Sequence, residues 1–208
     1  MLAGPRTSLT NLLVHPLAKP ALWGLCAVPM VVLIGRALAD QLGANPAEAL
    51  IRETGEWALR WLWACLAITP LRQVLQLPAL LRFRRALGVT AFVYGVIHLL
   101  AYAGLDQGWQ LDAIVKDVLK RNFILVGVLA MLAMTPLALT SFNRAVRALG
   151  GRRWQALHRW VYAVAVLVLL HFFWMKSGKN DFGEVAVYGA VLAALLGWRF
   201  GRWARTVQ

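Results

Sequence analysis

The chain has 208 residues, of which 60% are hydrophobic, and it carries a formal net charge of +13. A soluble globular protein of this length is only about 45–50% apolar. Such a charge would suggest nucleic acid as the partner of a soluble chain, but here the basic residues border long apolar segments, so we predict a membrane protein that contacts lipid and does not bind nucleic acid.

Apolar segments long enough to cross a bilayer as helices, about 20 residues each, recur along the chain. We predict an all-α integral membrane protein with one domain over residues 1–208. Its six transmembrane helices are expected at about 21–38, 57–77, 86–104, 122–140, 154–174 and 183–201.

Two of the connecting segments have a distinct character. Residues 40–56 are polar and acidic, which predicts a short connection outside the membrane. Residues 106–121 carry apolar side chains at helical spacing, which predicts an amphipathic helix on the outer surface. That helix either docks a partner or simply packs on the rim of the bundle.

The charges are divided between the two sides of the predicted spans. With six spans, all nine acidic residues fall on one side and most of the basic residues on the other. Cytoplasmic loops of membrane proteins are rich in Lys and Arg, so we predict that both termini are cytoplasmic. The corresponding location is the bacterial inner membrane, as a multi-pass protein.

The residues at membrane depth exclude several chemistries. Cys26 and Cys65 lie inside predicted spans and outside any C-x-x-C-H motif, so we interpret them as small buried residues rather than sites of covalent haem attachment. No Ser-His-Asp set, H-E-x-x-H motif or carboxylate pair lies at that depth. Hydrolysis is therefore not predicted.

Histidines are the ionisable groups that need an explanation. His98 and His171 lie in the third and fifth spans, which run in the same direction, at roughly 18–26 Å from the inner surface. A titratable group at such depth indicates function. Two imidazoles at matching depth suit the axial ligands of a haem iron, whereas zinc would need more ligands. The alternative is that both are hydrogen-bonded core histidines.

His158 and Arg84 form a second candidate pair near the inner face. Arg84 is within about 40° of the helical face of His98, but on one continuous ideal helix His158 and His171 would be about 140° apart. One haem is therefore easier to build than two, and a second requires a bend or bulge in the fifth span.

Arginines at the ends of the second span are further candidates. Arg60 lies near the outer interface and Arg72 near the inner one. Either they extend to lipid headgroups or they pair with the carboxylates of a bound cofactor. Four aromatic residues either line the cofactor pocket or anchor the helices at the interface: Tyr94, Tyr102, Trp160 and Tyr162.

Four segments resemble those of a known family. They are TGEWALRWLWACLAITPLR, RRALGVTAFVYGVIHLLAY, TPLALTS and LGGRRWQALHRWVYAVAVLVLLHFFW. Together they resemble the MsrQ (YedZ) family of haem-binding membrane subunits, which belongs to the ferric reductase-like transmembrane domain superfamily.

The resemblance implies that His98 and His171 are axial ligands of b-type haem, that His158 is the third family histidine, and that the haem is held within the bundle. Two-haem relatives carry a second histidine where this chain has Arg84, so the resemblance leaves open whether the chain binds one haem or two. The resemblance also implies FMN, a quinol or cytosolic flavin reductase as electron donor, and the periplasmic molybdopterin reductase subunit MsrP as acceptor.

Together with the histidine pair, the resemblance implies an electron-transfer subunit of an oxidoreductase complex, not its catalytic subunit. By the same resemblance it would pass electrons across the membrane to a methionine sulfoxide reductase that repairs oxidised periplasmic proteins. The alternative is a histidine-containing transporter or metal-binding structural partner without haem.

Overall fold

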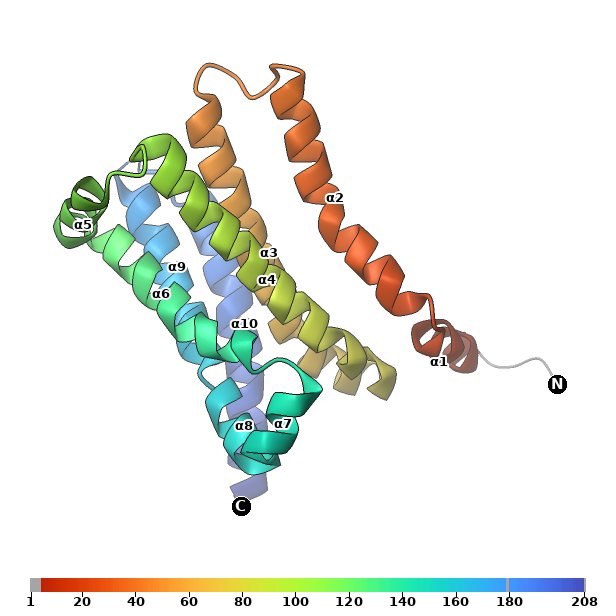
Figure 1. Cartoon of the computed structure of the whole chain (residues 1–208). Helices are drawn as coiled ribbons and strands as arrows, with labels where there is room; N and C mark the ends of the chain where they lie inside the picture. The colour runs from red at the N-terminus through yellow and green to blue at the C-terminus, as the bar shows by residue number, and fades with distance from the viewer. Residues whose placement is uncertain (1–4, 179, 208) are drawn as a thin grey trace.

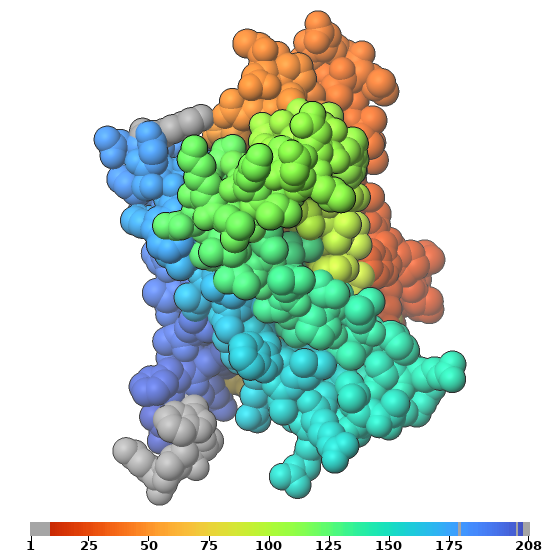
Figure 2. Space-filling model, turned by 60° about the vertical axis from the view of Figure 1, so that its left-hand side comes forward, coloured from red at the N-terminus to blue at the C-terminus, as the bar shows by residue number. Residues whose placement is uncertain are grey.

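The computed structural model describes residues 5–178 and 180–207, and within them the chain is a bundle of helices (Figure 1). The helices in chain order are α1 (Pro5–Val14), α2 (Ala18–Leu38), α3 (Pro46–Val74), η1 (Pro78–Leu80), α4 (Leu81–Ala101), η2 (Tyr102–Asp106), α5 (Leu111–Lys120), α6 (Asn122–Leu139), α7 (Asn143–Leu149), α8 (Gly151–His158), α9 (Val161–Ser177) and α10 (Gly183–Val207). In Figure 2, the segment around α5 (green) lies at one end of the molecule and α7 and α8 (turquoise) lie toward the other.

Five segments of the described chain are long and apolar enough to cross a membrane. They are Ala18–Leu38, Pro78–Asp106, Asn122–Leu139, Gly151–Ser177 and Gly183–Arg202. The remaining predicted span, 57–77, falls on α3, a 29-residue helix whose length suffices but whose charged side chains lower its hydropathy. A multi-pass membrane protein is confirmed, while the sixth span stays a prediction.

The prediction that residues 40–56 form a connection was wrong for most of that segment. The α3 helix begins at Pro46, because the Asn45 side chain caps it by accepting a hydrogen bond from the backbone N–H of Glu48 at 3.1 Å. Proline is favoured at the first helical position. By contrast, the amphipathic helix predicted within 106–121 is confirmed as α5.

The predicted span 154–174 is not one continuous helix. Arg159 and Trp160 form a turn between α8 and α9. Both residues keep right-handed helical backbone angles, but the Trp160 N–H bonds the carbonyl of Leu157, three residues back, at 3.1 Å. The angle of about 140° between His158 and His171 assumed an unbroken helix. The irregular turn lies between the two histidines, so the real angle departs from this ideal value.

Two helix pairs form the centre of the bundle. The α3 helix packs against α4, and α6 packs against α9. A shared apolar core joins the pairs, and its fully buried members include Leu62, Leu66 and Val164. One pair carries His98, on α4, and the other carries His171, on α9. The packing of the two pairs against each other therefore sets the distance between these histidines.

Tyr94 links the α2 helix to this centre. The hydroxyl of Tyr94, on α4, donates to the carbonyl oxygen of Cys26 at 2.9 Å and accepts from the backbone N–H of Met30 at 3.1 Å. Tyr94 is only 4% exposed. In a regular α-helix the N–H of Met30 would bond directly to the carbonyl of Cys26, four residues earlier. Here the Tyr94 hydroxyl bridges these two groups, at a point of α2 that contains Pro29.

Tyr94→Phe is expected to lower the free energy of unfolding by about 0.5–1 kcal/mol, because the backbone groups of α2 can recover one bond with each other but lose their link to α4. Unfolding of the purified protein in detergent measures this loss. Unchanged stability would mean that the hydroxyl does not hold α2.

Candidate functional site

His98 is held by a backbone carbonyl of the neighbouring helix. Its Nδ1 lies 2.8 Å from the carbonyl oxygen of Ile51 on α3. A carbonyl oxygen only accepts hydrogen bonds, so Nδ1 carries the proton and Nε2 keeps a lone pair. The ring is therefore fixed in the tautomer that a metal ligand needs.

His171 repeats this arrangement in the second helix pair. Its Nδ1 lies 2.6 Å from the carbonyl oxygen of Phe123 on α6, and by the same argument its Nε2 is left to bind. The two histidines, on α4 and α9, thus have equivalent partners on α3 and α6.

A glycine makes room for each imidazole. A Cβ added at Gly55 would lie 2.9 Å from Nδ1 of His98, and one added at Gly127 would lie 2.8 Å from Nδ1 of His171. Each glycine follows the accepting carbonyl by four residues, which is about one helical turn. Only glycine lets a ring approach the helix so closely.

Both imidazoles line one cavity at the α5 end of the bundle, with a volume of about 490 Å³. Their ring centroids are 6.1 Å apart. Two metal–nitrogen bonds of about 2 Å, with the half-widths of two imidazoles, span roughly that distance. The walls are largely apolar, as in sites for cofactors. A haem iron with an imidazole on either side fits this donor set.

The cavity also offers few other metal ligands. Among the residues that the structure describes, there is no group of three or more His, Cys, Asp or Glu side chains placed to hold one metal ion. Two histidines suit an iron that brings four equatorial nitrogens in its own macrocycle.

A second cavity of about 500 Å³ lies toward the opposite end and brings together Arg84 and His158, as the sequence predicts. Arg85 and Arg159 also line it. His158 is held differently from the outer pair: its ring stacks on Trp154 with centroids 3.9 Å apart, and its Nε2 lies 3.1 Å from the Thr140 hydroxyl. A guanidinium stays protonated and has no lone pair to offer iron, so Arg84 suits a carboxylate of a ligand.

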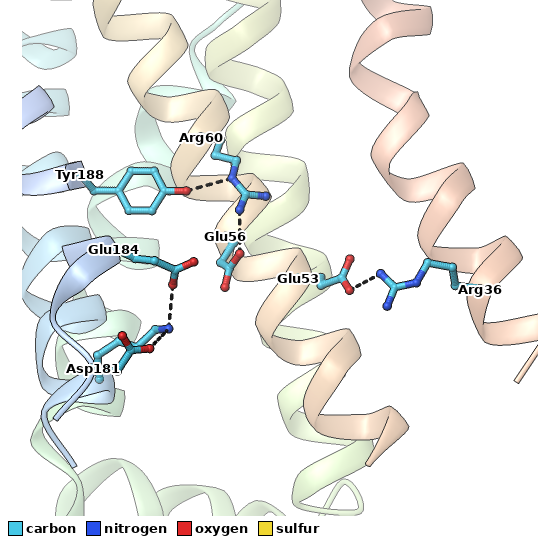
Figure 3. A network of polar contacts seen from close by, with 8 residues as sticks. Arg36, Glu53, Glu56, Arg60, Asp181, Glu184 and Tyr188 are labelled. Carbon is cyan, nitrogen blue, oxygen red and sulfur yellow. Dashed lines mark hydrogen bonds and ion pairs between the residues drawn. The ribbon is translucent and has the colours of Figure 1, made fainter. Parts of the chain in front are cut away.

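The other two candidate arginines lie outside both cavities, among the residues described. Arg60 donates to the Tyr188 hydroxyl at 2.9 Å and to the Glu56 carboxylate at 2.8 Å (Figure 3). Arg72 is in the last turn of α3, with a buried Nε that has no hydrogen-bond partner. Of the four aromatic candidates, Tyr102 lines the outer cavity and Tyr162 the inner one, while Trp160 is 60% exposed.

Known proteins were compared with the chain. Residues 54–170 match the family described as "Ferric reductase like transmembrane component". A protein of Polaromonas naphthalenivorans is 54% identical over 194 residues, which is 93% of this chain and 89% of the relative. Proteins of Ralstonia nicotianae (49% identical, 86% of this chain and 82% of the relative) and Bordetella pertussis (46%, 90% and 90%) are also similar.

All three are named "Protein-methionine-sulfoxide reductase heme-binding subunit MsrQ". The chain belongs to the MsrQ family. No solved structure matches it significantly.

In this MsrQ-family chain, four residues of the outer site were not predicted from the sequence: Gly55, Gly127, Arg52 and Arg121. The glycines leave a weak signal, since an isolated glycine inside a helical pattern often has a packing reason. The arginines line the mouth of the outer cavity. Nothing in the sequence distinguishes them from arginines that only face water.

Proposed function

We propose that the chain is a b-type cytochrome subunit of the bacterial inner membrane, with haem held between His98 and His171. The observation that carries this proposal is the pair of imidazoles facing one apolar cavity, each with Nδ1 bound to a backbone carbonyl. Both termini are proposed to be cytoplasmic, which places this cavity on the periplasmic side.

Haem bound there would supply a one-electron couple. Because both axial positions would be filled by histidine, the site has no open coordination position for a substrate and suits electron transfer rather than oxygen activation. The chain's own residues hold the two imidazoles in one tautomer and surround them with largely apolar side chains.

The proposed partners follow from the family. The acceptor is a periplasmic molybdopterin reductase, MsrP, which reduces oxidised methionine residues. The donor is a quinol or a cytosolic flavin reductase that delivers electrons at the opposite face. FMN is retained as a family expectation, and we assign no residue to it.

The inner cavity supports a second haem site. Its volume is close to that of the outer cavity, and its lining includes His158 and Arg84. His158 would exchange its contact with Thr140 for iron, and Arg84 would pair with a haem carboxylate.

The test of the function is a reduced-minus-oxidised visible spectrum of the purified protein. Soret and α bands of a low-spin b-type haem support the proposal. A colourless protein would contradict it and favour the transporter or haem-free metal-binding alternative.

Haem stoichiometry tests the inner site separately. We expect two haems per chain, falling to one in His158→Ala with the outer pair intact, as measured by pyridine haemochrome against protein concentration. One haem in the wild type, unaffected by His158→Ala and by Arg84→Gln, would make the inner pair structural.

A further inference from the structure

Two arginines stand at the mouth of the outer cavity. Arg52 on α3 and Arg121 at the start of α6 are its cationic lining residues within the described chain. Arg52 comes directly after Ile51, whose carbonyl oxygen accepts from His98. Arg121 comes two residues before Phe123, whose carbonyl oxygen accepts from His171. Each half of the site therefore brings one histidine and one guanidinium.

The ion pairs of these arginines leave room for a further partner. Nη1 of Arg52 lies 3.8 Å from the Glu48 carboxylate, beyond hydrogen-bond distance, and both side chains are more than 40% exposed. Such an exposed pair contributes little to stability.

Arg121 is bound through a single nitrogen. Its Nε contacts Asp117, a carboxylate that also accepts from the Tyr102 hydroxyl at 2.7 Å. A guanidinium has five N–H donors, four of them on the two terminal nitrogens. The Asp117 contact therefore orients Arg121 without using its terminal nitrogens, and 46% of the side chain remains exposed.

Three acids also line this cavity: Glu48, Glu56 and Asp106. Glu48 lies 3.8 Å from Arg52, Glu56 is bound by Arg60, and Asp106 accepts from the neutral Gln107 amide at 2.8 Å. The walls also include buried apolar side chains, among them Leu59, Leu62 and Met134. An amphiphilic ligand with two carboxylates on one edge would therefore place that edge at the mouth, where charge-assisted hydrogen bonds replace its hydration.

We propose that Arg52 and Arg121 bind the two propionate carboxylates of the haem held between His98 and His171, one carboxylate each. They are positioning residues that fix the rotation of the macrocycle in its plane, with its polar edge toward the mouth of the cavity. This assignment rests on the proposed function, and it replaces Arg60, whose guanidinium is already bound by Glu56 and Tyr188.

The test compares haem with haem dimethyl ester, which has the same ring and iron but no carboxylates. The full-length protein, produced without haem and kept in detergent, is titrated with each compound and followed at the Soret band. Arg52→Gln and Arg121→Gln are each expected to weaken haem binding about tenfold, as the loss of a charge-assisted hydrogen bond would, and to leave ester binding unchanged. The midpoint potential should fall in both variants with haem, because removing a cation near iron disfavours the reduced form.

Arg36→Gln is the matched control. Arg36 is a partly exposed arginine near the same end of the bundle that pairs with Glu53, and it is not among the residues lining the cavity in the described chain (Figure 3). It should bind haem and ester as the wild type does. Retained ester binding also shows that each variant is folded.

Four outcomes overturn the proposal. Equal losses for haem and ester would mean that the arginines support the fold, and no loss for either would place the carboxylates elsewhere. A loss confined to haem in Arg60→Gln would restore the assignment made from the sequence. If the wild type binds neither compound, the proposed function fails, and this inference fails with it.

Discussion

His98→Ala and His171→Ala are each expected to abolish the outer haem site, weakening haem retention by more than about 100-fold. Removing either imidazole leaves iron with one protein ligand and opens a polar void in an apolar cavity. The loss is measured as haem per chain after purification, and as the disappearance of the low-spin spectrum from any haem that remains.

His15→Ala is the control for this pair. His15 is exposed and its Nδ1 accepts a hydrogen bond from the backbone N–H of Leu17, so its removal should change neither haem content nor spectrum. A full complement of low-spin haem in His98→Ala or His171→Ala would show that the ligands have been assigned wrongly.

Gly55→Ala and Gly127→Ala are expected to have the next largest effect, although each adds one methyl group. The new Cβ would lie 2.9 Å or 2.8 Å from an imidazole nitrogen, which is too close, so the ring must turn away from its carbonyl partner. Loss of that hydrogen bond should lower haem affinity about 10–100-fold and convert part of the spectrum to high spin.

Gly24→Ala and Gly35→Ala provide matched controls, because a Cβ at either position meets nothing within 4 Å. Within a helix this change should stabilise the protein by about 0.5–1 kcal/mol. Wild-type affinity and spectrum in Gly55→Ala and Gly127→Ala would mean that the histidines do not depend on their glycines.

Much of the fold follows from the sequence, because apolar segments of membrane length and an amphipathic 10-residue helix leave strong periodic signals. The exceptions have local causes. The cap at Asn45 and Pro46 extends α3 into a segment whose acidity suggests a loop. The break at Arg159 lies in a sequence without proline, so the hydrophobic pattern alone predicts a continuous helix.

The site was only partly predictable for a different reason. Depth in the membrane is a property of a single helix, so His98 and His171 could be paired from the sequence alone. The partners of these histidines depend on which helices are neighbours: Gly55 serves His98 because α3 packs on α4, and Gly127 serves His171 because α6 packs on α9. The same applies to Arg52 and Arg60, which lie on the same helix, α3, although only Arg52 is among the lining residues of the outer cavity.

The carbonyl partners of the two histidines have one more consequence. Many metal-bound histidines donate their second N–H to a carboxylate, which can take up that proton, whereas the carbonyls of Ile51 and Phe123 cannot. The direct hydrogen-bond partner of each ligand N–H is therefore a group that cannot take up its proton. If the chain carries electrons as proposed, each ligand would keep its Nδ1 proton at that bond when the charge on the iron changes.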